Sequence, residues 1–186
     1  MYCAGSAIEW ARGLDLFSDY EEINAFAGSV AIDRDLAFVP ALSGLACPHW
    51  DRRAAGAWIG LSLDTTKTDM AQALLEGIAF RASEVIEAMA RLTPMGNTVS
   101  IDGGVSANPY FCQFLADALG RRVTIPGFAE LTAIGTAQLA GARAVREQDP
   151  GTTRKYSPER DLSDQRARFA DAVSRTRAWR QRGNAG

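Results

Sequence analysis

Apolar residues recur every three or four positions between Asp69 and Leu92, which predicts the longest helix of the chain. The apolar face of this helix consists of Met70, Leu74, Ile78, Ala82, Val85, Met89 and Leu92. Thr66 or Thr68 precedes this face and is the type of residue that caps a helix N-terminus. The dipeptide Thr93-Pro94 then ends the periodic pattern.

The next segment predicts a strand, a helix and a second strand. Residues 99–101 favour a buried strand, and a double-glycine turn follows them. Asn108 and Pro109 are typical of a helix start, so we expect a helix over 109–119 that Gly120 ends. The β-branched run at 122–125 predicts the second strand. This order favours an α/β domain with parallel pairing.

The first third of the chain carries weaker signals. Residues 8–20 have apolar positions at helical spacing and predict an amphipathic helix. Residues 36–45 predict a short extended run, and residues 57–63 predict a strand. The intervening segment reads as an irregular loop, in which we expect His49 to be packed or half-exposed rather than catalytic. We expect Asp51 to Arg53 to face solvent, with an anion bound by the two arginines as the alternative.

Two features predict how the C-terminal part packs. The small residues Ala133, Ala137, Gly141 and Ala144 form a stripe that would let a helix lie close against a sheet. Residues 154–182 contain nine basic and four acidic residues, with an apolar edge formed by Phe169, Val173 and Trp179. We therefore interpret residues 160–182 as a terminal helix that docks by this edge in a single domain spanning 1–186; an RNA- or lipid-binding arm is the alternative.

Composition narrows the classes of function. A chain of 186 residues with 47% hydrophobic residues is long enough for one domain with a core, and a net charge of -2 gives no reason to expect nucleic acid or a membrane as partner. The start of the chain lacks a signal-peptide pattern, so we expect a cytoplasmic protein. Cys3, Cys47 and Cys112 show no metal-binding spacing, and His49 is the only histidine, which argues against Ser-His-Asp and multi-histidine metal chemistry.

The double-glycine turn has two interpretations. In the first it is a corner in which Asn108 caps the following helix and Asp102 hydrogen-bonds the turn. In the second, the glycine platform and the positive helix end approach a phosphate or adenosine. A glycine pair after a strand is a weak signal by itself and leaves both open.

Longer motifs favour the second interpretation. Five segments occur in one order along the chain: GSAIEW, FVPALSGLACPHWDRRAAGAWIGL, ALLEGIAFRASEVIEAM, IDGGVSANPYFCQFLADALG and AELTAIGTAQLAGA. Together they resemble the C-terminal half of the FGGY carbohydrate kinases, and the glycerol kinase branch most of all. GAWIGLSLDTTKTDMAQALLE is similar to the family's C-terminal signature, although Leu74 lies outside the usual choice there.

The resemblance implies an α/β fold, namely the actin-like ATPase (ribonuclease-H-like) C-terminal lobe, here truncated at its N-terminus. Such a lobe closes with a second one over ATP or ADP with Mg²⁺ and a polyol. By position, Gly5, Gly103, Gly104 and Asn108 match nucleotide-binding residues. Glu9 falls where glycerol kinases usually have glutamine, which places a carboxylate near a phosphate-bearing ligand and would weaken its binding or make it depend on a cation.

The implied reaction is transfer of the γ-phosphoryl group of ATP to a hydroxyl of glycerol or a related polyol or sugar. The family's catalytic aspartate and phosphate loop have no counterpart in this sequence, so we assign no catalytic or metal-binding residue and expect no activity of residues 1–186 alone. The partners expected are ATP or ADP, an N-terminal kinase lobe from the same gene or a separate chain, and a second copy in a homo-oligomer. A stand-alone nucleotide-binding module and a subunit of a split kinase are the alternatives.

Overall fold

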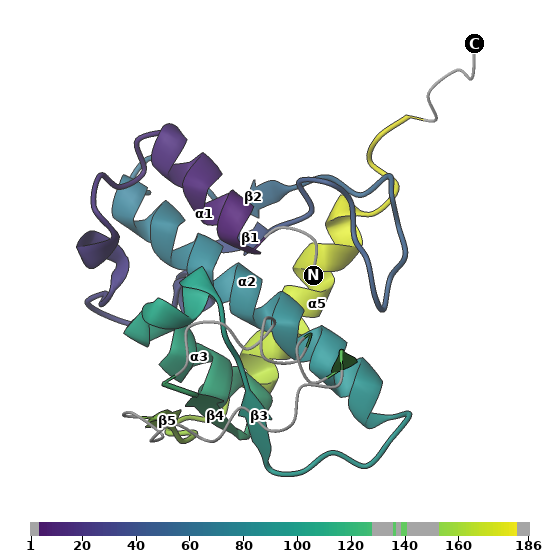
Figure 1. The fold of residues 1–186 in the computed structure, drawn as a ribbon. Helices are drawn as coiled ribbons and strands as arrows, with labels where there is room; N and C mark the ends of the chain where they lie inside the picture. Colours follow the sequence, from purple (N-terminus) through teal and green to yellow (C-terminus); the bar gives the residue numbers. More distant parts are fainter. Residues whose placement is uncertain (1–3, 128–135, 137–138, 141–152, 182–186) are drawn as a thin grey trace.

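A computed structural model describes residues 4–127, 136, 139–140 and 153–181 (Figure 1). Its α-helices are α1 (Ala4–Gly13), α2 (Lys67–Ala90), α3 (Pro109–Leu119) and α5 (Ser163–Thr176). Short 3-10 helices are η1 (Tyr20–Ile23), η2 (Ala31–Arg34) and η3 (Gly104–Ala107). The strands are β1 (Ala37–Val39), β2 (Ala57–Ile59), β3 (Thr98–Ser100), β4 (Arg122–Ile125) and β5 (Arg154–Tyr156).

Helix α2 is the centre of the fold, and it contacts α1, α3, α5 and β1 (Figure 1). Thr66 caps it: its hydroxyl accepts a hydrogen bond from the Asp69 backbone, and the Asp69 side chain accepts one from the Thr66 backbone. The predicted helix is therefore confirmed, with bounds two residues earlier at each end. Nearly all its side chains from Ala71 to Ser83 are buried, because neighbours cover it on several sides.

A three-stranded sheet has the order β3-β4-β5. Strands β3 and β4 pair in parallel and α3 connects them, as expected for a strand–helix–strand unit. Strand β3 is not buried as predicted: Thr98 and Ser100 are exposed and Val99 between them is half-buried, so only one face of this strand is covered. Strand β5 pairs antiparallel with β4, a pairing the sequence pattern did not predict.

The helix predicted over residues 8–20 was wrong at both ends. Helix α1 begins at Ala4 and ends at Gly13, and Asp15 takes a left-handed conformation with φ 57°. Asp19 then caps η1 instead of continuing α1, because its carboxylate accepts the Glu21 backbone N–H. Trp10 of α1 stacks on Trp58 of β2 at a centroid distance of 5.6 Å, which fixes α1 on the two-stranded β1–β2 sheet.

The C-terminal segment docks through only part of its expected apolar edge. Phe169 and Val173 of α5 are buried, but Trp179 is 73% exposed. Helix α5 spans Ser163–Thr176, and Ala178 beyond it has φ 51°, so Trp179 lies outside the helical register of the other two residues. The residues of the predicted small-residue stripe, Ala133, Ala137, Gly141 and Ala144, lie outside the described residues.

The loop at 47–56 is irregular as predicted, but Asp51 and Arg53 are not simply solvated. Asp51 accepts hydrogen bonds from the backbone of Arg53 and Ala178, each at 2.8 Å, and the bond from Ala178 is the main reason that the pKa of Asp51 is lowered. The Arg53 guanidinium donates to the carbonyl oxygens of Ala178 and Arg180. These residues therefore hold the chain after α5 against the loop.

Candidate functional site

A cleft of about 780 Å³ lies between α1, α2 and the turn that leads into α3. All five residues predicted to contact a ligand line it: Gly5, Glu9, Gly103, Gly104 and Asn108. They come from positions about one hundred residues apart in sequence, so tertiary packing brings them together. The structure thus places the candidate residues at one site, while contact with a nucleotide stays a prediction.

The two glycines of the turn face open space. Gly103 has φ 88°, a conformation that favours glycine, and it precedes η3. A Cβ atom added at Gly103, at Gly104 or at Gly5 would meet no heavy atom within 4 Å. No described neighbour therefore requires a glycine at Gly104 or Gly5. The absence of a side chain at these two positions leaves free space in the cleft.

Asn108 has a structural role that both interpretations of the turn share. Its side-chain oxygen accepts the Phe111 backbone N–H at 2.7 Å, which is the predicted helix cap. Its side-chain nitrogen donates to the carbonyl oxygen of Ile23 at 2.8 Å, which ties the turn to the end of η1. Asn108 is only 9% exposed, so its position in the cleft is fixed by these two bonds.

Glu9 does not face the cleft as an isolated carboxylate. It forms an ion pair with Arg12 at 2.9 Å and accepts a hydrogen bond from the Tyr20 hydroxyl. The Arg12 guanidinium also lies 5.1 Å from the centroid of the Tyr20 ring. The hydrogen bond from the Tyr20 hydroxyl to Glu9 is the main reason that the pKa of Tyr20 is raised. The cation beside Glu9 offsets part of the repulsion expected between its carboxylate and a phosphate.

The remaining lining is largely apolar. Ile78 and Ile86 from α2 and Ile101 after β3 contribute aliphatic surface, and the described lining includes no lysine or arginine. Asp102 and Glu9 are the acidic residues there. Such a cleft suits a flat, uncharged ring with hydroxyl groups better than a chain of phosphates. Among the described residues, no three His, Cys, Asp or Glu side chains gather to hold a metal ion, and no helix is long and apolar enough to cross a membrane.

Sequence reasoning missed the residues that hold the turn from outside. Arg154 of β5 donates to the carbonyl oxygens of Ser106 at 2.8 Å and Ala107 at 3.4 Å. The buried Cys112 thiol also donates to the Ser106 carbonyl, and burial raises the pKa of this thiol to about 11. Arg154 lies 48 residues from Ser106 in sequence, so no local pattern indicated the contact.

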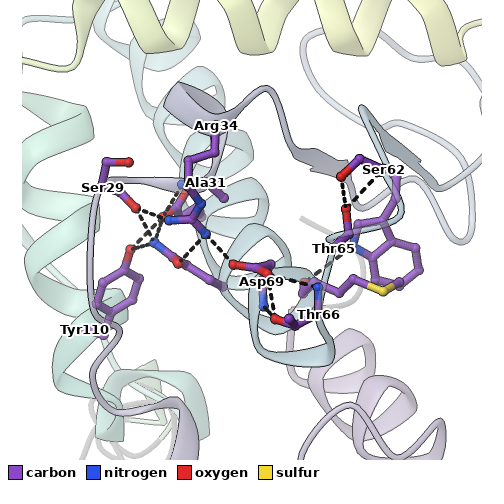
Figure 2. A network of polar contacts seen from close by, with 12 residues as sticks. Ser29, Ala31, Arg34, Ser62, Thr65, Thr66, Asp69 and Tyr110 are labelled. Atoms are coloured by element: carbon purple, nitrogen blue, oxygen red, sulfur yellow. Dashed lines mark hydrogen bonds and ion pairs between the residues drawn. The ribbon is translucent and has the colours of Figure 1, made fainter.

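A polar network whose centre is buried joins α3 to α2 and to the segment before β1 (Figure 2). The Glu76 carboxylate is its centre: it accepts hydrogen bonds from the Tyr110 hydroxyl at 2.5 Å, from the Ala31 backbone at 2.9 Å and from Gln72 at 2.8 Å. Arg34 donates to Gln72 at 3.0 Å and to Asp69 at 2.7 Å. The pattern of apolar positions along α2 gave no indication of this network.

Known proteins are similar to this chain over most of its length. Residues 1–144 match the family model of the C-terminal domain of FGGY carbohydrate kinases. A glycerol kinase of Rhodopirellula baltica is 35% identical over 191 residues, an alignment that covers 96% of this chain and 35% of that protein. Glycerol kinase 5 of Danio rerio is 41% identical over 138 residues, which cover 74% of this chain and 26% of that protein.

Solved structures share the fold. A Plasmodium falciparum glycerol kinase with ADP has a TM-score of 0.70 at 24% identity, over 93% of this chain and 37% of that one. A ligand-bound xylulose kinase from Lactobacillus acidophilus has a TM-score of 0.66 at 23% identity, over 92% and 36%. These likenesses confirm the actin-like α/β fold of a C-terminal lobe.

The alignments cover most of this chain but only a part of each relative. Nearly all of the chain aligns with the Rhodopirellula baltica protein, yet it spans only about a third of that protein's length. The family model covers more than three quarters of the chain, including α1, the turn and α3. The chain therefore belongs to the FGGY family of carbohydrate kinases, and residues 1–144 correspond to the C-terminal domain of that family.

Proposed function

We propose that this chain is the ATP- and ADP-binding part of a glycerol kinase-like carbohydrate kinase, and that the cleft between α1, α2 and α3 receives the adenosine part of the nucleotide. The observation that carries this proposal is the convergence of Gly5, Glu9, Gly103, Gly104 and Asn108 on one largely apolar cleft. The glycerol kinase structure that contains ADP supports the choice of ligand.

Each residue has a physical role in this proposal. Gly5 and Gly104 leave the backbone bare, so a flat ring or a ribose can approach it closely. Asn108 fixes the turn between Ile23 and α3. Glu9, held by Arg12, accepts a hydrogen bond from a ribose hydroxyl or a base amino group.

The phosphates and the acceptor hydroxyl need groups that the described cleft does not have. Its described lining contains no cationic side chain. In this proposal Mg²⁺ arrives with the nucleotide. We assign phosphoryl transfer to glycerol or a related polyol, and the base that accepts the hydroxyl proton, to a complex of this chain with an N-terminal kinase lobe.

Replacing Gly104 by alanine should weaken ADP binding about tenfold or more without lowering stability, because the new methyl group occupies ligand space and meets no protein atom. Isothermal titration calorimetry with Mg-ADP measures the affinity, and thermal denaturation of the ligand-free variant measures stability. Gly13→Ala is the matched control, since Gly13 also has free space around it but does not line the cleft.

Equal ADP affinity in the parent chain and in Gly104→Ala would contradict the proposed site. Asn108→Ala is a less informative variant, because it removes a helix cap and a buried hydrogen bond and would lower stability together with any affinity.

The purified chain should not phosphorylate glycerol by itself. A coupled assay with Mg-ATP and glycerol tests this, with a full-length relative such as the Rhodopirellula baltica glycerol kinase as the positive control. Activity that appears only after addition of the N-terminal part of that relative would support a kinase completed by a second lobe. ADP binding without activity in either mixture would favour a stand-alone binding module. Turnover by the chain alone would overturn the proposed inactivity.

A further inference from the structure

The hydrogen bonds around Glu76 reach the two parts of the chain that hold the turn at residues 103–108 in place. One support is α3, where Tyr110 lies two residues after Asn108 and donates to the Glu76 carboxylate at 2.5 Å. The other is the segment 23–31: its first residue, Ile23, accepts the hydrogen bond from Asn108, and its last residue, Ala31, donates to Glu76 at 2.9 Å. Together with the chain at 23–31 and 108–110, these three hydrogen bonds close a ring that runs from Glu76 to Asn108 and back.

We propose that Glu76 is a positioning residue for the nucleotide cleft: by holding Tyr110 and Ala31 it fixes the turn at residues 103–108 against Ile23. The nucleotide in this statement rests on the proposed function, whereas the link between Glu76 and the turn rests on the described contacts alone. Glu76 is 1% exposed and does not line the cleft, so it acts on a ligand only through its neighbours.

The strength of these contacts depends on the charge of Glu76. Burial raises the pKa of Glu76 to about 7, although the hydrogen bonds from Tyr110 and Gln72 oppose this shift. The charged group that faces it is Arg34 of η2, whose guanidinium is shared with Asp69. Burial and then the charge of Glu76 raise the pKa of Tyr110, so Tyr110 stays a hydrogen-bond donor.

An ionised Glu76 accepts hydrogen bonds about twice as strong as those a neutral carboxyl accepts, so we expect the turn to tighten as the pH rises through 7. The contribution of Glu76 to overall stability runs the other way. Because its pKa is higher in the folded chain than the ordinary value of 4.5, the folded state binds more protons between pH 4.5 and 7, and stability falls as the pH rises through that window. A residue that contributed only to overall stability would not tighten the turn while the free energy of unfolding falls.

The test measures adenosine affinity by calorimetry at pH 6 and pH 8.5, because adenosine carries no phosphate that titrates in this range. We expect the parent chain to bind about five times more tightly at pH 8.5. Glu76→Gln keeps the shape and an oxygen that can accept from Tyr110 and Gln72, but it replaces the oxygen that accepts from Ala31 by a donor and removes the charge. Its affinity should therefore be the same at both pH values. The exposed Glu159, which does not line the cleft, provides the matched control Glu159→Gln, which should behave like the parent.

A second variant tests the ring without changing the charge. Tyr110→Phe keeps the aromatic contacts with Phe26 and Phe114 and removes the hydroxyl that donates to Glu76. In the ligand-free chain at pH 8, hydrogen exchange of the amides at 103–108 and 110–111 should be about five times faster in Tyr110→Phe than in the parent.

The outcomes separate the two proposals. Absence of adenosine binding by the parent, together with faster exchange in Tyr110→Phe, overturns the proposed ligand and supports the positioning role. Equal pH dependence of affinity in the parent and in Glu76→Gln overturns the positioning role, as does unchanged exchange in Tyr110→Phe.

Discussion

Replacing Gly77 by alanine should lower the free energy of unfolding by about 3 kcal/mol, one of the two largest effects expected in this protein. Gly77 lies on the face of α2 that meets β1, and an added Cβ would stand 2.0 Å from the carbonyl oxygen of Phe38. The obstacle is backbone rather than a movable side chain, and Phe38 and Val39 of β1 are almost completely buried. The helix and the strand must therefore separate.

Chemical denaturation measures this effect, and Gly13→Ala again provides the comparison. Alanine at Gly13 meets no atom within 4 Å, so its stability should be unchanged or raised by about 0.5 kcal/mol. A Gly77→Ala variant as stable as the parent would mean that α2 and β1 are not packed as closely as described.

Replacing Phe80 by alanine should cost about 3–5 kcal/mol of stability. The Phe80 ring contacts Phe114 of α3 and Phe169 of α5, each at a centroid distance of 5.0 Å, so it joins three helices. Its removal leaves a cavity at their meeting point and weakens the docking of α5. Urea denaturation followed by circular dichroism measures the loss.

Leu92→Ala is the control for Phe80→Ala, because Leu92 is 89% exposed and its truncation should change stability by less than about 0.5 kcal/mol. Similar losses for Leu92→Ala and Phe80→Ala would contradict the described core. A loss confined to Phe80→Ala, together with increased proteolysis within α5, would show that the ring holds the C-terminal helix.

The sequence by itself determined the elements whose signals are local. Asn108, Pro109 and Gly120 are neighbours of the helix they delimit, and α3 has the bounds that they predict. Thr66 and Asp69 form their capping box within one turn of α2. The family, too, was accessible from sequence, because its motifs preserve both residue types and spacing over most of the chain. The five candidate residues at the cleft followed from that resemblance.

Tertiary structure decided whatever depends on partners distant in sequence. Strand β5 is visible only through its pairing with β4, and Arg154 reaches Ser106 across 48 residues. Glu76 lies within a helix whose periodicity indicates packing alone, yet Ala31 and Tyr110 make it the centre of a polar network. The physical reason is that caps and turns are stabilised by residues adjacent in sequence. The pKa of a buried carboxyl group and the free space around a glycine depend instead on atoms that only the folded chain brings near.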